Sequence, residues 1–135
     1  DTSYFTIYNG VYASNITMFE SNGFKCTFTS ASYQTANKTD LTLKLNVANN
    51  SEYSFSEFSI SNLKINNVDI GYESTTYALG KGKTKDLTIT STNADAWNYY
   101  AATITGDIVF KDIEENVIAE GTLFCVPMLP NYVIA

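Results

Sequence analysis

The stretch Asp40–Asn49, with the sequence DLTLKLNVAN, is the clearest structural signal in the chain. Leucine and valine alternate in it with threonine, lysine and asparagine, so every second side chain is apolar. Successive side chains of a β-strand point to opposite faces of a sheet, so this pattern predicts a strand with one face against a core. The same alternation predicts strands at Phe24–Ser30, Ile104–Lys111 and Val117–Cys125.

Weaker strands are predicted in five further segments: Tyr4–Tyr8, Tyr53–Ile60, Leu63–Ile70, Thr75–Leu79 and Asp86–Ser91. Within Tyr53–Ile60 the apolar positions change parity, which predicts a β-bulge near Glu57. Turn-forming pairs such as Asn22-Gly23 and Asn66-Asn67 separate the strands.

Strands that recur about every ten residues, with no long helical pattern, predict an antiparallel β-sandwich. The length of 135 residues fits one domain, which we place at residues 1–135. Residues 94–101 interrupt the strands, because good helix formers follow Asn93, a suitable N-cap. We expect a short helical crossing there, with Trp97 closing one end of the sandwich.

The composition excludes several classes of function. The chain has a formal net charge of −6, all eight of its basic residues are lysine, and it contains no histidine. Histidine-based catalytic triads, histidine-ligated zinc and arginine clamps on phosphate are therefore excluded. The acidic balance argues against nucleic acid as a partner, and no apolar run is long enough to predict a transmembrane segment. Abundant serine, threonine and asparagine are typical of extracellular proteins, so we expect a secreted or cell-surface location.

Cys26 and Cys125 share the inward parity of the apolar residues in their strands, so both are expected to point into one core. An early strand and the last strand can be neighbours in an antiparallel sandwich, and we therefore expect a disulfide between them. The bridge would close a loop of about 100 residues, stabilise the fold by roughly 4–5 kcal/mol and require an oxidising compartment. The alternative is a pair of buried free thiols that pack as small apolar side chains.

Five aromatic residues are candidate ligand contacts: Trp97, Tyr99, Tyr100, Tyr72 and Tyr77. Aromatic faces beside asparagine and aspartate can stack on sugar rings, which would make them the platform of a carbohydrate-binding module. The simpler interpretation, which we favour, is that Trp97 closes the core and the tyrosines occupy strand positions.

The lysines of the segment GKGKTK, Lys81, Lys83 and Lys85, alternate and could project from one side of an extended turn. There they could meet an anionic sugar or a cell-wall phosphate. Because three lysines give only a weak field at ordinary salt, we favour a solvated hairpin loop that glycine loosens.

The acidic segment KDIEEN contains Asp112, Glu114 and Glu115. Clustered carboxylates can bind calcium, but this spacing matches no calcium loop, so we expect a solvated turn and no metal or other cofactor. No G-x-S-x-G, P-loop or H-E-x-x-H motif is present, and most acids fall in turns, so we expect no enzymatic activity.

The run Leu41–Gly71, LTLKLNVANNSEYSFSEFSISNLKINNVDIG, is followed by a Gly-Lys turn at Gly80–Lys85, a short segment at Ala94–Tyr100 and a strand at Ile108–Asp112. This order resembles small immunoglobulin-like domains in secreted proteins and lipoproteins of Gram-positive bacteria, over about residues 40–125. It departs from them at Asn66-Asn67, where those domains tend to carry glycine. The resemblance implies an immunoglobulin-like sandwich with an accessory or binding role in the cell envelope. It carries over no functional residue, because the shared positions are structural.

We therefore expect a non-enzymatic extracellular or cell-envelope module that binds a protein or a cell-wall glycan. Two alternatives stay open: a carbohydrate-binding module with an aromatic platform, and a surface subunit that assembles with itself. Nothing in the sequence favours a particular oligomeric state.

Overall fold

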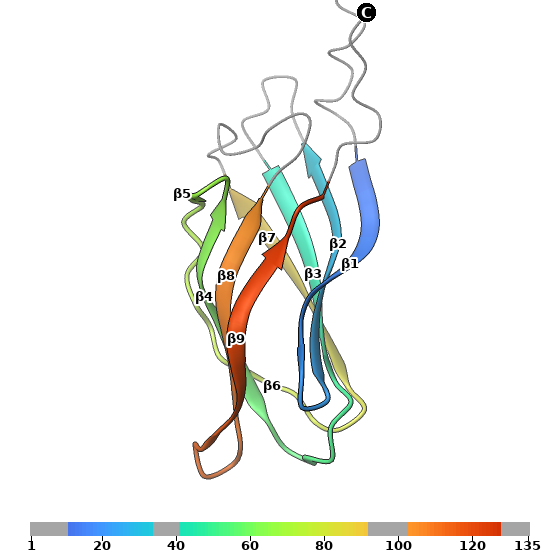
Figure 1. The fold of residues 1–135 in the computed structure, drawn as a ribbon, viewed down its shortest axis with the longest axis vertical. Coiled ribbons are helices and arrows are strands. Elements are labelled where there is room, and N and C mark those ends of the chain that lie inside the picture. The colour runs from blue at the N-terminus through green and yellow to red at the C-terminus, as the bar shows by residue number, and fades with distance from the viewer. Residues whose placement is uncertain (1–10, 34–40, 92–102, 128–135) are drawn as a thin grey trace, which may run out of the picture.

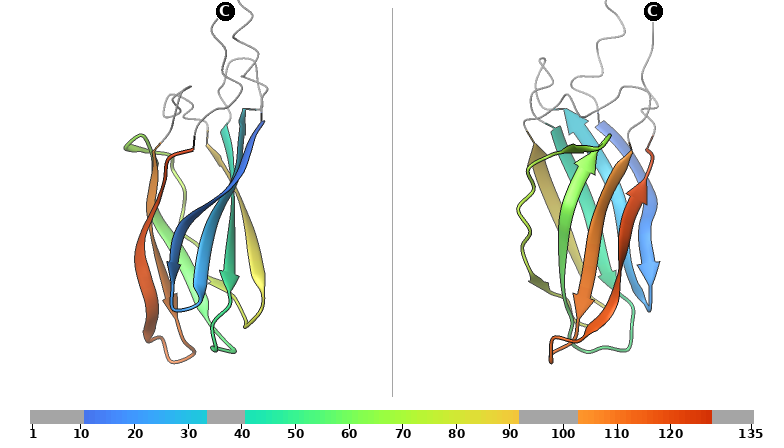
Figure 2. Two further views of the ribbon diagram at one scale, coloured as in Figure 1. Left: turned by 45° about the vertical axis from the view of Figure 1, so that its right-hand side comes forward. Right: turned by 60° about the vertical axis from the view of Figure 1, so that its left-hand side comes forward.

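The computed structural model describes residues 11–33, 41–91 and 103–127. In these ranges the chain forms nine β-strands and no helix, and the strand pairs are antiparallel. The strands make two sheets that face each other as two layers (Figures 1 and 2). The predicted all-β antiparallel sandwich is thus confirmed. The predicted helical crossing at 94–101 and the predicted strand Tyr4–Tyr8 lie outside the described residues.

The two sheets divide the strands between them in a fixed order. The first sheet has the order β1-β2-β3-β7, with β1 (Val11–Ser21), β2 (Phe24–Tyr33), β3 (Leu41–Asn49) and β7 (Thr84–Ser91). The second sheet has the order β5-β4-β8-β9, and the short β6 pairs with the beginning of β4. Its strands are β4 (Glu57–Ile65), β5 (Val68–Asp69), β6 (Tyr77–Ala78), β8 (Ile104–Lys111) and β9 (Val117–Cys125).

The core lies between the two sheets. The alternation in the sequence predicts five inward-facing residues: Leu43, Leu45, Ile108, Phe110 and Leu123. All five are at most 2% exposed, which confirms the predicted register. Rings from both sheets stack within the core, where the centroids of Phe24 and Phe110 are 4.3 Å apart. Burial of apolar side chains of this size stabilises the fold by roughly 1.5–3 kcal/mol for each residue.

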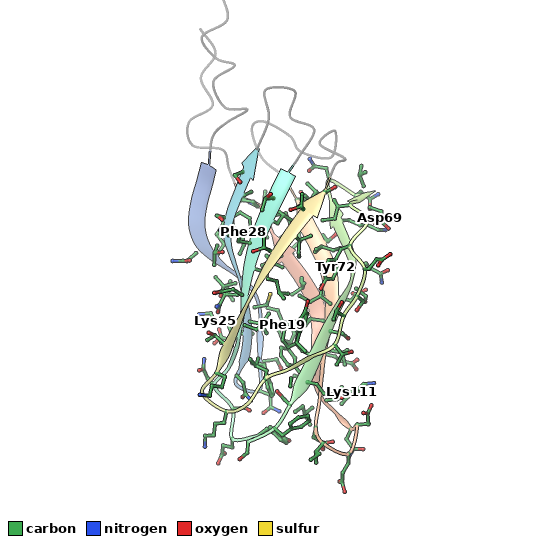
Figure 3. All side chains as sticks on the ribbon, turned by 180° about the vertical axis from the view of Figure 1, so that it is seen from behind. Phe19, Lys25, Phe28, Asp69, Tyr72 and Lys111 are labelled. Carbon is green, nitrogen blue, oxygen red and sulfur yellow. The ribbon has the colours of Figure 1, made fainter. Side chains whose placement is uncertain are left out.

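Phe19 closes the side of the sandwich where β1 and β9 lie next to each other (Figures 1 and 3). Its ring stacks on Phe110 with a centroid distance of 6.1 Å. A Cβ atom at Gly121 of β9 would lie 2.7 Å from the Phe19 ring, so only glycine leaves room for the ring.

A polar cluster is buried at the end of the sandwich where β3 ends. Asn49 is fully buried, and its side-chain amide donates hydrogen bonds to the backbone oxygens of Tyr53 and Leu79, each at 3.0 Å. Its side-chain oxygen accepts from the N–H and the hydroxyl of Ser51. Ser56 donates its hydroxyl to the same Leu79 oxygen at 2.6 Å. All four hydrogen-bonding positions of the Asn49 amide are therefore filled. We call Asn49, Ser51 and Ser56 the Asn49 cluster.

Backbone hydrogen bonds tie three connections to the Asn49 cluster. The N–H of Asn49 donates to the oxygen of Lys83 at 3.0 Å, and the N–H of Gly82 donates to the oxygen of Asn49 at 2.8 Å. The N–H of Asn50 donates to the oxygen of Gly23 at 2.7 Å. The cluster thus fixes the β1–β2 turn, the β3–β4 loop and the turn before β7 relative to one another.

The long first strand, β1, is absent from the predicted strands. Two register shifts against β2 break its alternation of apolar and polar residues. Such shifts insert extra residues on one strand, so the period of two that identifies a strand in sequence is lost.

The segment from residue 53 to residue 70 also differs from the prediction. One strand, β4, begins at Glu57 and runs to Ile65, and the predicted Asn66-Asn67 turn then leads into β5. The bulge predicted near Glu57 is wrong. Residues 53–55 belong to the loop that the Asn49 cluster holds, and the register shift of β4 against β8 lies between Ser61 and Lys64.

The predicted disulfide between Cys26 and Cys125 is also wrong, because both cysteines are free and buried. The two strands are not neighbours in one sheet: β2 lies between β1 and β3, whereas β9 is the last strand of the second sheet. Burial raises the pKa of each thiol to about 12, and the neighbouring Cys125 adds to the effect on Cys26. The alternative interpretation, two buried thiols packed as apolar side chains, is the one confirmed.

We predict that neither thiol of the folded protein reacts with a thiol reagent near pH 8, because both are buried and protonated well above that pH. After unfolding without reductant, the reagent should count two thiols in each chain. Above the ordinary thiol pKa of 9.0, the unfolded chain loses protons that the folded chain keeps, so the free energy of unfolding should fall between about pH 9 and pH 12. Unfolded protein without titratable thiols would contradict this prediction.

Candidate functional site

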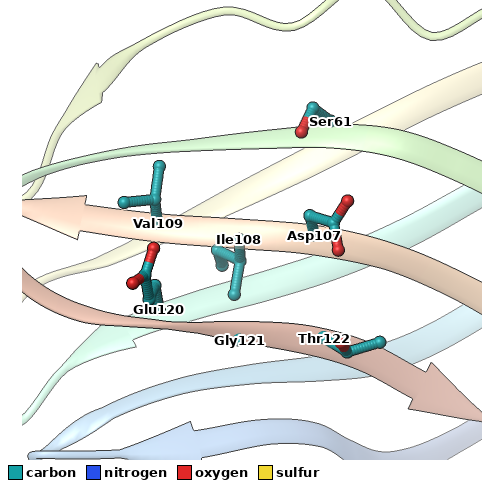
Figure 4. Close-up of a pocket in the computed structure, with 7 residues that line it drawn as sticks. All are labelled: Ser61, Asp107, Ile108, Val109, Glu120, Gly121 and Thr122. Atoms are coloured by element: carbon teal, nitrogen blue, oxygen red, sulfur yellow. The ribbon is translucent and has the colours of Figure 1, made fainter.

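A shallow groove crosses the outer face of the second sheet along β8. It consists of two depressions of about 320 and 380 Å³ that share Asp107 and Thr122. Figure 4 shows the first of them. We call it the outer groove. Its polar lining includes Ser61, Asn62, Lys64, Asp107, Glu120 and Thr122.

Strand pairing sets the positions of the two carboxylates in the outer groove. Asp107 on β8 is opposite Ser61 on β4 and Thr122 on β9. Glu120 is opposite Val109, which places it diagonally across from Asp107. Diagonal neighbours on paired strands lie about 7–8 Å apart. Both carboxylates therefore border the same part of the groove, as Figure 4 shows.

A β-bulge in β4 shapes one wall of the groove. The register against β8 shifts between Ser61 and Lys64, and as a result Ser61 and Asn62 are both exposed. Asn62 has a φ of 54°, in the left-handed region that asparagine tolerates better than most residues. Its side-chain amide donates to Asp107 Oδ2 at 2.7 Å. The bulge thus fixes an amide and a carboxylate side by side on the outer face.

The outer groove can exchange hydrogen bonds with a polar ligand. The hydroxyls of Ser61 and Thr122 donate and accept, the carboxylates of Asp107 and Glu120 accept, and the ammonium group of Lys64 donates. Within the described part of the chain, no three His, Cys, Asp or Glu residues lie close enough together to hold a metal ion.

Tyr72 and Tyr77, two of the aromatic residues singled out in the sequence, are half-buried and pack against the core. Figure 3 shows Tyr72 on the side of the molecule where β4 and β7 are in view. Burial is the main cause that raises the pKa of Tyr72, and the nearby Tyr77 raises this pKa further. The ring of Tyr77 has Lys85 Nζ 4.9 Å from its centroid and the ring of Phe58 at 5.6 Å. Both tyrosines are therefore engaged within the chain.

The three candidate lysines do not line the outer groove. Lys81 and Lys83 are exposed on the turn that the Asn49 cluster fixes, at one end of the sandwich. Trp97, Tyr99 and Tyr100 lie outside the described residues. Of the described candidates, Lys85 and Tyr77 are in contact with each other.

The acidic segment is a turn organised by its own aspartate. Asp112 Oδ1 accepts the N–H groups of Glu114 and Asn116, each at 2.9 Å. The backbone hydrogen bond from Asn116 is the main cause that lowers the pKa of Asp112. The Asp112 carboxylate therefore stabilises the turn of the β8–β9 hairpin.

Sequence reasoning did not identify the outer groove. A signal for it is present in β4, where the apolar residues change parity between Ile60 and Leu63. The lining residues come from three strands that are distant in sequence, so their grouping follows from the sheet order and not from any local motif.

Compared with models of protein families, with curated proteins and with solved structures, the chain has no significant match. Across the described ranges, no helix is long and apolar enough to cross a membrane. The inferences about function therefore rest on the residues and the geometry of this chain.

Replacement of Asn62 tests whether its backbone conformation shapes the groove. Asn62→Ala should lower the free energy of unfolding by about 1–2 kcal/mol, because alanine pays this cost in the left-handed region. Asn62→Gly loses the same hydrogen bond but adopts this φ freely, so it should be more stable than Asn62→Ala by about 1 kcal/mol. Urea denaturation measures both variants. Equal losses would show that the backbone conformation at residue 62 is unimportant.

Proposed function

We propose that the chain is a non-enzymatic binding module with an immunoglobulin-like fold, secreted or held at the cell envelope, and that its outer groove binds a glycan. The hydrogen-bonded pair of Asn62 and Asp107 in the groove is the observation that carries the proposal.

The strand order supports the immunoglobulin-like part of the proposal. In immunoglobulin domains, strands A, B and E are adjacent in one sheet and strands C, F and G in the other. The adjacent strands β2-β3-β7 and β4-β8-β9 follow the same order along the chain, with β1 added beside β2. The resemblance of the segment order to small domains of secreted proteins and lipoproteins, and the abundance of serine, threonine and asparagine, support the extracellular location.

The chemistry of the outer groove supports a glycan ligand. Each hydroxyl of a sugar both donates and accepts a hydrogen bond, and adjacent amide and carboxylate groups offer the complementary pair. Asn62 and Asp107 hold this pair in place before any ligand arrives, which reduces the entropy lost on binding. The groove is also shallow, and polar side chains from three strands line it, so several sugar units of an extended chain could lie across the sheet.

A glycan-binding experiment with a matched control tests the proposal. An array of cell-wall and other oligosaccharides identifies a ligand, and titration calorimetry measures its dissociation constant. Asp107→Ala should weaken binding at least about tenfold, because a hydrogen bond to a charged group contributes about 1.5–3 kcal/mol. The control is Asp86→Ala, since Asp86 accepts from Asn46 at 2.8 Å in an equivalent exposed pair on the first sheet. This variant should bind like the wild-type protein.

Three outcomes would contradict the proposed site. The first is that no oligosaccharide binds at millimolar concentration. The second is that Asp86→Ala weakens binding as much as Asp107→Ala. The third is that Trp97→Ala abolishes binding while Asp107→Ala leaves it unchanged, which would favour the aromatic platform instead.

A further inference from the structure

Besides the β1–β2 turn, three connections meet at the end of the sandwich that holds the Asn49 cluster. They are the β3–β4 loop (Asn50–Ser56), the lysine turn (Gly80–Lys83) and the acidic hairpin (Asp112–Asn116). Figure 1 and the left view of Figure 2 show the lysine turn and the acidic hairpin at opposite margins of this end, with the β3–β4 loop between them.

Apolar side chains are exposed at this end. Ile113, at the tip of the acidic hairpin, is 75% exposed, and Tyr53 and Phe55 of the β3–β4 loop are 37% and 36% exposed. A single exposed apolar residue needs no explanation, but large apolar side chains on neighbouring loops are typical of interaction surfaces.

The lysine turn and the acidic hairpin carry charges of opposite sign, and the exposed Glu52 lies on the β3–β4 loop between them. Lys81 and Lys83 are exposed on the lysine turn, and Glu114 and Glu115 are exposed on the acidic hairpin. Within residues 11–33, 41–91 and 103–127, no ion pair joins these side chains to an opposite charge. Each margin of the end therefore presents charge that a partner surface of opposite sign would neutralise.

Hydrogen bonds hold the backbone of both margins. Lys83 N–H donates to the oxygen of Gly80 at 3.0 Å, and the Asn49 cluster fixes the lysine turn. Asp112 accepts the N–H groups that close the acidic hairpin. Little backbone entropy would be lost when a partner covers this end.

We propose that this end of the domain is a self-association surface on which a second copy of the chain docks about a twofold axis. A twofold axis through the β3–β4 loop brings the lysine turn of each copy over the acidic hairpin of the other. Tyr53 and Phe55 of both copies then lie between the two charged contacts, and Ile113 lies within each contact. The separation of charge within one patch favours a second copy over another partner, because a surface with both signs at opposite margins is complementary to itself under such an axis.

Charge reversal with the full chain tests the proposal by analytical ultracentrifugation. The wild-type protein should form a dimer whose dissociation constant rises with salt, since screening weakens exposed charge pairs. Lys81→Glu/Lys83→Glu should weaken dimerisation at least about tenfold, because each replacement acts twice in a symmetric dimer. Glu114→Lys/Glu115→Lys should weaken it to a similar extent.

A mixture of the two charge-reversed variants provides the decisive result. In the mixed dimer every charged contact again joins opposite signs, so the heterodimer should regain at least the affinity of the wild-type dimer. Repulsion between the two acidic chains as a whole predicts the opposite result for Glu114→Lys/Glu115→Lys. Each exchange changes the charge by +2, so the two together bring the net charge from −6 to −2. If repulsion alone governed association, this variant would dimerise more tightly than the wild-type protein.

Two controls separate this surface from the rest of the molecule. Lys44→Glu, an exposed change of the same sign on β3, should leave the dimer intact. Ile113→Ser should weaken the dimer without lowering the melting temperature, since the side chain is mostly exposed in the monomer. A wild-type protein that stays monomeric up to about 1 mM, a concentration at which even weak interfaces associate, would overturn the proposal. Failure of the mixed variants to pair would overturn it as well.

Discussion

The buried side chain of Asn49 joins parts of the two sheets that no strand pairing connects. Asn49 ends β3 of the first sheet, whereas Leu79 follows β6 of the second. An amide buried without partners would cost roughly 2–7 kcal/mol, so its complete set of hydrogen bonds is a condition for closing this end of the sandwich. The Asn49 cluster thereby sets where β4 begins and where the lysine turn enters β7. The first segment leads into one wall of the outer groove, and the second carries one margin of the proposed self-association surface.

The two proposed surfaces use different parts of the fold. The outer groove lies on the face of a paired sheet, where strand register fixes Asp107 between Ser61 and Thr122. The self-association surface lies on connections at the end of the sandwich, where side-chain caps and turns replace strand pairing. Because the two surfaces do not share residues, one copy of the chain can bind a glycan and a second copy of the chain at the same time. Pairing of two copies would then place two glycan sites on one particle and raise the avidity for a polymeric ligand.

The sequence predicted those features that follow from local alternation. The inward set of β3, with Leu43 and Leu45, and the turns at Asn22-Gly23 and Asn66-Asn67 are found as expected, and these asparagines adopt the positive φ that such turns require. Features that depend on bulges were missed. β1 loses its period of two through register shifts, and the bulge predicted near Glu57 is absent, whereas β4 has its irregular position at Asn62.

The pairing of distant segments could not be derived from the sequence. The parity of Cys26 and Cys125 correctly predicts that both side chains point into the core, but parity does not give the backbone geometry that a disulfide requires, and both cysteines are free. Nor does a local pattern show that the amide of Asn49 would bind Leu79, thirty residues away in the chain. The candidate site also depends on the pairing of distant segments, because Asn62 and Asp107 come together only through the pairing of β4 with β8.

Native-state hydrogen exchange of the backbone amides around Asn49 tests most directly whether this cluster holds the structure together. The N–H groups of Ser51, Leu79 and Gly82 each donate within or next to the cluster. If the cluster is a condition for folding, these amides should exchange only through global unfolding, with the same opening free energy as the amides of the core strand β3. Exchange through local opening, at the rates typical of mobile surface loops, would contradict the central role of Asn49.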